Sequence, residues 1–550
     1  MSINEFESFF GRQDILDLLR KRVVDLKEGY RQNIAFIGDS YLGKSTILKK
    51  FISDLDEKNI VPIYLNLENK DIEYFYQRFV GSILYHFSKI KKLPLQQDIN
   101  LLMESTYSFI PQTIKLIKRI KMLKNHGRQE EAIMDMLSLP LNFGKEADAF
   151  VLIVLDEFHH LQDFNMPDIF QELGKRIMTQ KRCLYVVTSS QPVVAENILS
   201  EKLSLLFGNF EKVKIKPFDL KTSREFIHFI LKGIKISDHL SDFLIDFTGG
   251  FPLYLQLLCH EIIHLCTHHK QSEVFVPILS QAIEDVLFNH WGVLSRHFDL
   301  TLQQLSAGKG NTITSPLLFS LSEGKKKIND LVKEVSVKQN QITQKINRLN
   351  ELGVVVKNGK FYYIRDKLFK YWLKYVCRKI LYAMELDPAK EKNLLQEDIQ
   401  KAIDNFICTL QKDFSTRIVE LLYCFENEAF QINGRRYKLP LFQEVVPKKI
   451  RKRTGEYFDV IKASSAEGDW FIVLKKDNIG ENDINQFLAE AKKSKQKSQR
   501  CVLISLADLD ENTRVKALQE RMWIWNEREL NTLLNLYDKP FITAPNSVTA

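Results

Sequence analysis

The sequence has no long apolar run and no export signal. Its 550 residues contain no stretch that reaches the ~18 consecutive apolar residues of a membrane-spanning helix. The first residues, Met1–Glu7, lack the basic-then-apolar order of a secretory signal peptide. We therefore expect a cytoplasmic protein without a membrane partner.

Paired cysteines and a strong excess of charge are also missing. The seven cysteines include no Cys-x-x-Cys pair, which fits reduced thiols better than a disulfide framework or a zinc site. The net charge is +9, from 78 basic and 69 acidic residues, and this mild excess permits an anionic partner without requiring one. Positive charge is concentrated in Lys448–Arg453 and Lys492–Lys497, in the last quarter of the chain.

The stretch with the strongest signal lies near the N-terminus. An apolar run ends at Ile37, residues 38–45 have the spacing Gly-x-x-x-x-Gly-Lys-Ser, and a helical pattern follows. Glycines let backbone amides approach a polyphosphate, Lys44 adds positive charge near the β- and γ-phosphates, and the Ser45 hydroxyl can bind magnesium. This pattern predicts a P-loop for ATP and Mg²⁺. The expected nucleotide contacts in it are Gly38, Asp39, Ser40, Tyr41, Leu42, Gly43, Lys44, Ser45 and Thr46.

Two further apolar runs end in polar residues. Residues 150–155 precede Asp156 and Glu157, as in a buried parallel strand whose tip faces a ligand. This arrangement is typical of a Walker B element, in which Asp156 holds magnesium and Glu157 activates the attacking water. The run at 184–187 ends in Thr188-Ser-Ser, and we expect Ser189 to be a sensor hydroxyl near the γ-phosphate, with an ordinary strand-end turn as the alternative. Residues 125–145 are expected to form a polar connection.

The order of these parts resembles the AAA+-related STAND-type ATPases, especially the archaeal-type ATPases related to origin-recognition proteins. The resemblance covers residues 1 to about 270 and also includes Phe10-Gly-Arg12 and Gly249-Gly-Phe-Pro252. It implies that Gly11, Arg12 and Pro252 lie near the adenine and ribose. Members commonly carry a glycine-arginine pair after the sensor strand, where this chain has Asn209, so a trans-acting arginine finger is not expected from that position.

Residues 316–366 predict three helices and a hairpin around Asn358-Gly359. This order resembles a winged helix, whose third helix enters the major groove of DNA. The candidate DNA contacts are Gln341, Gln344, Lys345 and Arg348 on the third helix, with Lys357 and Lys360 on the wing. The alternative is a winged helix that packs against protein and whose charges are only solvated.

From about residue 387, the pattern of helices and strands is similar to the restriction-endonuclease-like domain that ends many archaeal-type ATPases. Such nucleases need an acidic residue on one strand and Glu-x-Lys on the next, because two carboxylates bind the metal. Asp459 and Lys475 match in place, but Val473 stands where the second carboxylate is needed. We therefore predict a degenerate domain that binds DNA or acts as a scaffold, with an active nuclease as the alternative.

Together these patterns predict an α/β protein with four parts. They are a P-loop NTPase core with a parallel sheet (1–220), a helical lid (221–300), a winged helix (301–385) and a small α/β restriction-endonuclease-like domain (386–550). The expected function is an ATP-hydrolysing switch that couples nucleotide state to DNA binding, for example in defence or mobile-element biology. A STAND-type signalling scaffold that forms homo-oligomers or binds a protein partner, and an ATP-gated nuclease, are the alternatives.

Overall fold

The computed structural model divides the chain into two compact units. Unit 1 comprises residues 1–226, 250–256 and 351–353, and unit 2 comprises the remainder. The structure describes residues 9–57, 59–68, 70–164, 166–203, 210–288, 292–307, 312–377, 388–432, 434–451, 457–475, 480–491, 498–507 and 509–542. Among these residues, no helix combines the length and the apolar character needed to cross a membrane.

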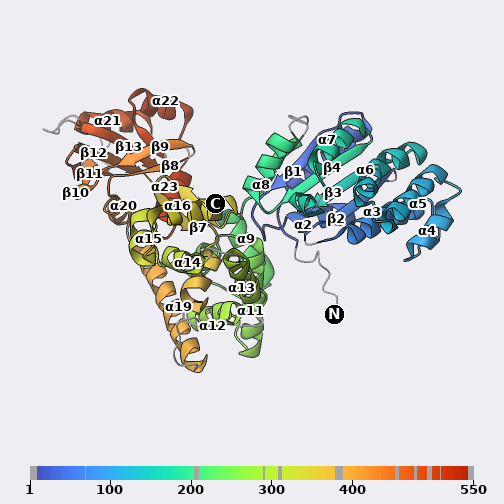
Figure 1. Ribbon diagram of the computed structural model, residues 1–550. Helices are drawn as coiled ribbons and strands as arrows, with labels where there is room; N and C mark the ends of the chain where they lie inside the picture. The colour runs from blue at the N-terminus through green and yellow to red at the C-terminus, as the bar shows by residue number, and fades with distance from the viewer. Residues whose placement is uncertain are drawn as a thin grey trace. The chain divides into compact units, whose positions relative to one another are not determined.

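Unit 1 is built on a five-stranded sheet in the order β2-β3-β4-β1-β5, with every pair parallel (Figure 1). The strands are β1 (Asn33–Ile37), β2 (Ile60–Asn66), β3 (Phe150–Asp156), β4 (Cys183–Ser189) and β5 (Phe210–Lys214). All residues of β1 and β4 are buried, as expected for apolar central strands covered on both faces. The predicted P-loop NTPase sheet is thereby confirmed.

Helices cover this sheet and extend outward from its β2 edge, where α3 packs against β2 (Figure 1). The helices are α1 (Gln13–Lys27), α2 (Lys44–Ser53), α3 (Ile72–Ile90), α4 (Ile99–Thr106), α5 (Pro111–Asn125), α6 (Gln129–Glu146), η1 (Phe158–Phe164), α7 (Ile169–Thr179), α8 (Pro192–Asn197) and η2 (Ile198–Lys202). The prediction of a polar connection at 125–145 was wrong, because α6 occupies it. Ile133, Met136, Leu137 and Phe143 are buried along one face of that helix.

Helices α9 (Leu220–Leu231) and α11 (Pro252–His268) each have residues in both units, and α16 (Gln339–Glu351) ends with one residue of unit 1. Unit 2 continues with α10 (Asp238–Thr248), α12 (Val276–Phe288), α13 (Val293–Ser306), α14 (Thr314–Ser322), α15 (Ile328–Val335), α16 (Gln339–Glu351), β6 (Val355–Asn358), β7 (Phe361–Ile364), α17 (Lys367–Trp372), η4 (Leu373–Cys377) and α19 (Pro388–Gln411). The segment 314–364 therefore has the three helices and the antiparallel hairpin that the sequence predicts.

The C-terminal part of unit 2 has a mixed sheet in the order β10-β11-β12-β13-β14, with a separate β8–β9 hairpin. Its elements are α20 (Phe414–Leu422), β8 (Glu428–Ile432), β9 (Arg435–Leu439), β10 (Phe442–Arg451), β11 (Tyr457–Ser465), β12 (Gly468–Lys475), α21 (Glu481–Ala491), β13 (Ser498–Ser505), α22 (Glu511–Gln519), β14 (Trp523–Trp525) and α23 (Glu527–Leu536). Strands β10 to β12 are antiparallel, and β13 and β14 run parallel to β12.

Within unit 2, the β6–β7 hairpin is docked on strand β8. The Asn358 side chain donates from Nδ2 to the Gln431 carbonyl (3.0 Å) and accepts the Gln431 amide on Oδ1 (2.6 Å). The Lys360 amide donates to the Ala429 carbonyl (3.2 Å). The hairpin tip therefore contacts protein. This is the arrangement expected in the alternative in which the winged helix packs against protein.

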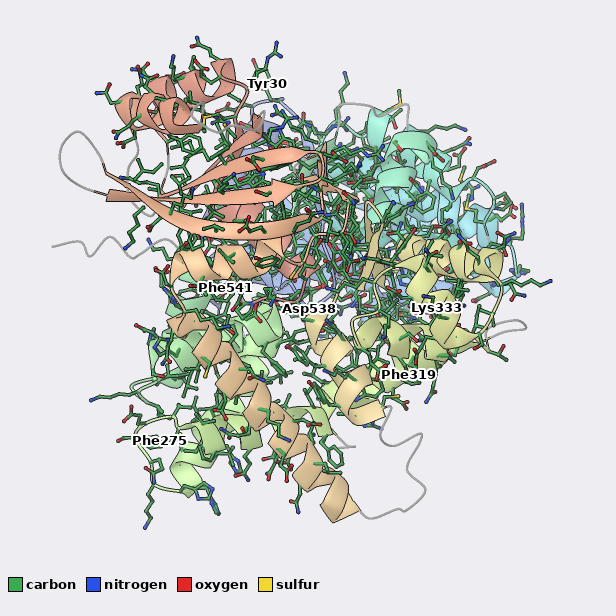
Figure 2. The ribbon with its side chains drawn as sticks, turned by 90° about the vertical axis from the view of Figure 1, so that its left-hand side faces the viewer. Tyr30, Phe275, Phe319, Lys333, Asp538 and Phe541 are labelled. Carbon is green, nitrogen blue, oxygen red and sulfur yellow. The ribbon has the colours of Figure 1, made fainter. Side chains whose placement is uncertain are left out.

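A buried lysine joins the turn before α15 to the end of α23, also within unit 2. Lys326, in the turn before α15, donates to the Leu536 carbonyl at the end of α23 (2.7 Å) and lies 2.9 Å from Asp538. Asp538, labelled in Figure 2, also accepts Lys370 (2.7 Å). Burial alone would raise the pKa of Asp538, but Lys370 and Lys326 lower it below the ordinary value, so the carboxylate stays ionised.

Candidate nucleotide-binding site

A cavity of about 580 Å³ lies at the carboxyl ends of the unit 1 strands, a size common for small-molecule sites. The loop between β1 and α2 forms one wall. Tyr41 and Gly43 adopt left-handed φ angles of 66° and 83° in this loop. At Gly38 an added Cβ would lie 2.4 Å from the Ile215 carbonyl oxygen, so only glycine fits there. From the predicted P-loop contacts, Ser40, Tyr41, Leu42, Gly43, Lys44, Ser45 and Thr46 line the cavity.

The other two predicted loop residues contribute their backbone carbonyl groups. Gly38 and Asp39 do not line the cavity, but their carbonyls accept the Lys44 ammonium at 2.9 and 2.8 Å. Lys44 Nζ also lies 3.9 Å from Glu157 Oε1. Burial lowers the pKa of Lys44, although Glu157 and Asp156 act in the opposite direction. Lys44 is thus held at the base of the loop by backbone oxygens.

Asp156, at the tip of β3, is fully buried and accepts hydrogen bonds from two hydroxyl groups. Thr188 on β4 donates to Oδ1, and Tyr64 on β2 donates to Oδ2 (2.5 Å). These donors come from the two strands that flank β3 in the sheet. Sequence reasoning missed Tyr64, although its position two residues before the end of an apolar strand places it on the face of Asn66, the register partner of Asp156.

Glu157 lines the cavity and has a left-handed φ of 55°. Its amide donates to Thr188 Oγ1 (3.0 Å), and its Oε2 accepts the Ser190 amide (2.7 Å). Burial raises the pKa of Glu157 above the ordinary value, although the nearby Lys44 opposes this shift. A half-buried carboxylate with a raised pKa, beside a lysine, is suited to accept a proton from water.

The predicted sensor residue is on the wrong side of its strand. Ser189 is fully buried, outside the cavity lining, and its hydroxyl contacts His159 Nδ1 on η1 (3.0 Å). Successive side chains of a strand point to opposite faces, so Thr188 and Ser190 face the site when Ser189 does not. Ser190 lines the cavity in its place.

Aromatic side chains form the other wall. The rings of Phe10, Phe218 and Phe226 pack together with centroid distances of 5.3–6.4 Å. Arg12, predicted to contact the nucleotide, lies over Phe218 at 4.8 Å from the ring centroid, and Pro252 lines the cavity at the start of α11. These segments lie far apart in the sequence, and the sequence alone did not reveal the aromatic wall.

Arg12 is held firmly in place. Its Nη2 donates to the Lys216 carbonyl, and within the described part of the chain its buried Nε has no hydrogen-bond partner. Burial lowers the pKa of Arg12. Gly11 does not line the cavity; its left-handed φ of 67° precedes the equally left-handed Arg12 and turns the chain toward Phe218.

The possible nuclease remnant is not assembled. Asp459 pairs directly with Leu474, and Val460 pairs with Val473. Directly opposed residues share a face, so Asp459 and Lys475 lie on opposite faces of the sheet. Their two faces belong to different core clusters, which contain Leu474 and Val473 respectively. Across the residues that the structure describes, no group of three or more His, Cys, Asp or Glu side chains could hold a metal ion.

The predicted DNA-contacting residues of α16 lie on its outer face. Gln341, Gln344 and Arg348 are exposed, and Lys345 is half-buried near the Leu305 carbonyl (3.5 Å). Ile342, Ile346 and Leu349 are fully buried on the other face. Lys357 and Lys360 have exposed side chains on the docked hairpin. Asn209 lies outside the described residues.

Comparison with known proteins agrees with the geometry of the cavity. Residues 9–258 match the family model of an ATPase domain predominantly from Archaea. Residues 9–258 therefore form a P-loop ATPase domain. This ATPase shows 12% identity to the Walker-type ATPase of Pyrococcus abyssi (67% of this chain and 96% of that chain, TM-score 0.47). It shows 12% identity to the ORC2 protein of Aeropyrum pernix (72% and 97%, TM-score 0.44).

The RuvB Holliday junction branch migration motor of Thermotoga maritima is 13% identical over 66% of this chain and 96% of that chain, with a TM-score of 0.32. A search of curated proteins found no match.

Proposed function

We propose that this ATPase is a magnesium-dependent switch that couples its nucleotide state to DNA binding by unit 2. One observation carries the coupling. Helix α11 begins at Pro252 in the nucleotide cavity, and from Leu257 onward its residues belong to unit 2. A nucleotide that contacts the head of this helix therefore acts directly on the element that leads into unit 2.

Residues in the cavity and directly behind it fit magnesium. Ser45, at the start of α2, and the fully buried Asp156 offer hard oxygen donors, the ligands that Mg²⁺ prefers. A carboxylate that is buried without a cation beside it is costly, and Asp156 is stabilised by two hydroxyl donors. When bound, magnesium supplies positive charge to the β- and γ-phosphates.

Different groups of the protein have different roles in hydrolysis. The loop amides and Lys44 hold the phosphates, because both present positive charge to the cavity. Glu157 accepts the proton of the attacking water, and the Ser190 amide holds its carboxylate in place. The aromatic wall and Pro252 bind the base, which apolar rings favour through stacking and desolvation.

DNA binding is supported by the outer face of α16. Glutamine and arginine can read base edges and phosphates, and this face carries Gln341, Gln344 and Arg348. Because the hairpin tip is bound to β8, we propose that α16 makes the main contacts and the wing lysines Lys357 and Lys360 contribute less.

A basic segment that sequence reasoning overlooked lies in unit 1. Residues 72–125 contain nine basic and three acidic side chains, a net charge of +6, against +9 for the whole chain. Tyr107 and Phe109 in this segment are each 46% exposed. A segment rich in basic side chains with exposed aromatic residues favours an anionic partner such as nucleic acid.

The central test is ATP turnover with and without duplex DNA. Lys44→Ala is expected to lower turnover by about 10²-fold or more, because it removes the phosphate-binding ammonium. Lys50→Ala, at a half-buried residue of the same helix that does not line the cavity, is the control and should retain the wild-type rate. A wild-type rate that DNA increases and that Lys44→Ala abolishes supports both parts of the proposal, whereas a rate that DNA leaves unchanged contradicts the coupling.

Arg348→Ala is expected to weaken duplex binding roughly 10- to 100-fold, as the loss of a base or phosphate contact does. The double substitution Lys357→Ala and Lys360→Ala should have a much smaller effect. Fluorescence anisotropy over a series of salt concentrations measures both, and wild-type affinity should fall steeply with salt. Binding that depends on the wing lysines and ignores Arg348 would assign the DNA contact to the hairpin.

The docked hairpin also favours a second candidate, a STAND-type scaffold, because it uses part of a potential DNA-reading surface for protein packing. In that case ATP would drive assembly of homo-oligomers or capture of a protein partner. Size measurement with ADP and with a non-hydrolysable ATP analogue separates the two functions. Assembly that requires the ATP analogue and ignores DNA favours the scaffold.

A further inference from the structure

His159 lies beside the carboxylate that we assign as the base for hydrolysis. Helix η1 starts directly after Glu157, and its second residue, His159, is only 1% exposed. The Nδ1 atom of His159 lies 3.0 Å from the Ser189 hydroxyl oxygen and 3.5 Å from Glu157 Oε2. One ring nitrogen therefore faces both the buried end of β4 and a carboxylate that lines the nucleotide cavity.

The partners of Ser189 indicate which ring nitrogen carries the hydrogen. The Gln191 amide donates to the Ser189 hydroxyl oxygen (3.1 Å), and the hydroxyl donates its single hydrogen to the Gln191 carbonyl (3.3 Å). Toward His159 the hydroxyl oxygen can then only accept, so the hydrogen of that contact belongs to Nδ1.

The other ring nitrogen favours the same tautomer. Burial, and then the neighbouring His160, lower the pKa of His159 to about 4, so the ring is neutral near pH 7 and carries one N–H group. Within the described part of the chain, its buried Nε2 atom has no hydrogen-bond partner. A hydrogen on Nε2 would be a buried donor without an acceptor, and it would leave the Nδ1 lone pair facing the Glu157 carboxylate.

We propose that His159 is a positioning residue for Glu157, and that its Nδ1–H group holds the carboxylate in the orientation that accepts a proton from water. The inference rests on the proposed function, in which Glu157 is the base. The Ser190 amide already donates to Oε2 (2.7 Å), and Nδ1–H is a second donor directed at the same oxygen. Oε1 is then the oxygen left to take the proton.

The distance between His159 and Glu157 suits a contact that closes during the reaction. Hydrogen bonds of catalytic groups are often long without substrate and shorten in the complex that reacts, and the present separation is 3.5 Å. Ser189 holds the imidazole ring in the meantime, from outside the cavity. Ser189 therefore acts through His159 and does not contact the nucleotide.

Three substitutions of His159 in the full chain test this role. The side-chain N–H of His159→Asn lies where Nδ1 was, that of His159→Gln lies where Nε2 was, and His159→Leu has none. We expect His159→Asn to keep nearly the wild-type kcat, whereas His159→Gln and His159→Leu should lose about 10- to 100-fold, as expected when a catalytic group is misplaced. KM for ATP, and the affinity for a non-hydrolysable ATP analogue measured by calorimetry, should stay close to wild type in all three.

The Glu157→Gln background shows whether His159 acts through the base. Without the base there is nothing to position, so adding His159→Gln should change the residual turnover by less than about twofold, because the two effects are not additive. His160→Asn is the control, since His160 contacts Asp163 (2.6 Å) on the same helix, and it should retain the wild-type kcat.

Two results would overturn the role of His159. One is an equal loss of kcat in His159→Asn and His159→Gln, and the other is an equal loss from His159→Gln with and without Glu157. Either result assigns His159 to packing and leaves Glu157 as the base. Failure of the proposed function is distinct, because Glu157→Gln alone would then turn over ATP at the wild-type rate, and His159 would have no base to position.

Discussion

Glu157→Gln is expected to lower kcat for ATP hydrolysis by about 10²- to 10⁴-fold and to leave ATP binding nearly unchanged. Glutamine has the same shape and can still accept the Ser190 amide, so the wall of the cavity is preserved. It cannot take a proton from water, which is the step assigned to the carboxylate. Steady-state turnover and equilibrium titration with a fluorescent ATP analogue measure the two effects separately.

Glu68→Gln provides the control, since Glu68 is a second, exposed carboxylate that lines the same cavity. Its turnover should remain close to wild type. The raised pKa of Glu157 adds a pH signature: the ionised form is lost at a higher pH than in an ordinary glutamate, so the acid limb of the wild-type profile should lie above the usual carboxylate range. Equal losses in both variants would place the base elsewhere.

The P-loop and the Asp156 strand could be predicted because their physical requirements are local. Phosphate binding needs glycines, a lysine and a hydroxyl at fixed spacing, and a buried strand must be apolar along its length. Strand order then brings the tips of β1, β3 and β4 to one edge of the sheet. The cavity therefore contains Lys44 and Glu157 as expected, with Asp156 fixed directly behind them.

Strand faces could not be predicted in the same way. Thr188, Ser189 and Ser190 are chemically similar, and only the folded chain decides that Ser190 lines the cavity and Ser189 does not. The same reasoning applies to Asp459 and Lys475: both lie in suitable strands, but the register places them on opposite faces. A shift of one residue in strand register moves every side chain to the opposite face, and the register cannot be read from composition.

Contacts between segments that are far apart in the chain also could not be predicted from the sequence. The aromatic wall combines Phe10 with Phe218 and Phe226, and no local pattern links them. The Asn358-Gly359 turn was recognised from its residues, yet the docking of its tip on β8 depends on a strand about 70 residues later. That contact has a measurable energetic consequence.

Gly359→Ala is expected to destabilise unit 2 by about 3 kcal/mol. Gly359 has a left-handed φ of 62°, which costs other residues roughly 1–2 kcal/mol. An added Cβ would also lie 1.9 Å from the Ala429 carbonyl oxygen, so the hairpin or β8 must move, and overpacking of this kind costs about 1–3 kcal/mol. The shift would stretch the paired hydrogen bonds between Asn358 and Gln431.

Gly434→Ala separates the two contributions. Gly434 is equally left-handed, with a φ of 77°, but an added Cβ meets nothing within 4 Å, so only the backbone cost of roughly 1–2 kcal/mol should appear. Urea unfolding of the full chain, followed by tryptophan fluorescence, reports on this region because Trp470, Trp523 and Trp525 lie in the C-terminal sheet. ATP binding should persist in both variants, since the nucleotide cavity lies in unit 1. If the two variants lose the same stability, the hairpin tip is not held against β8 in solution, and the wing is available to DNA after all.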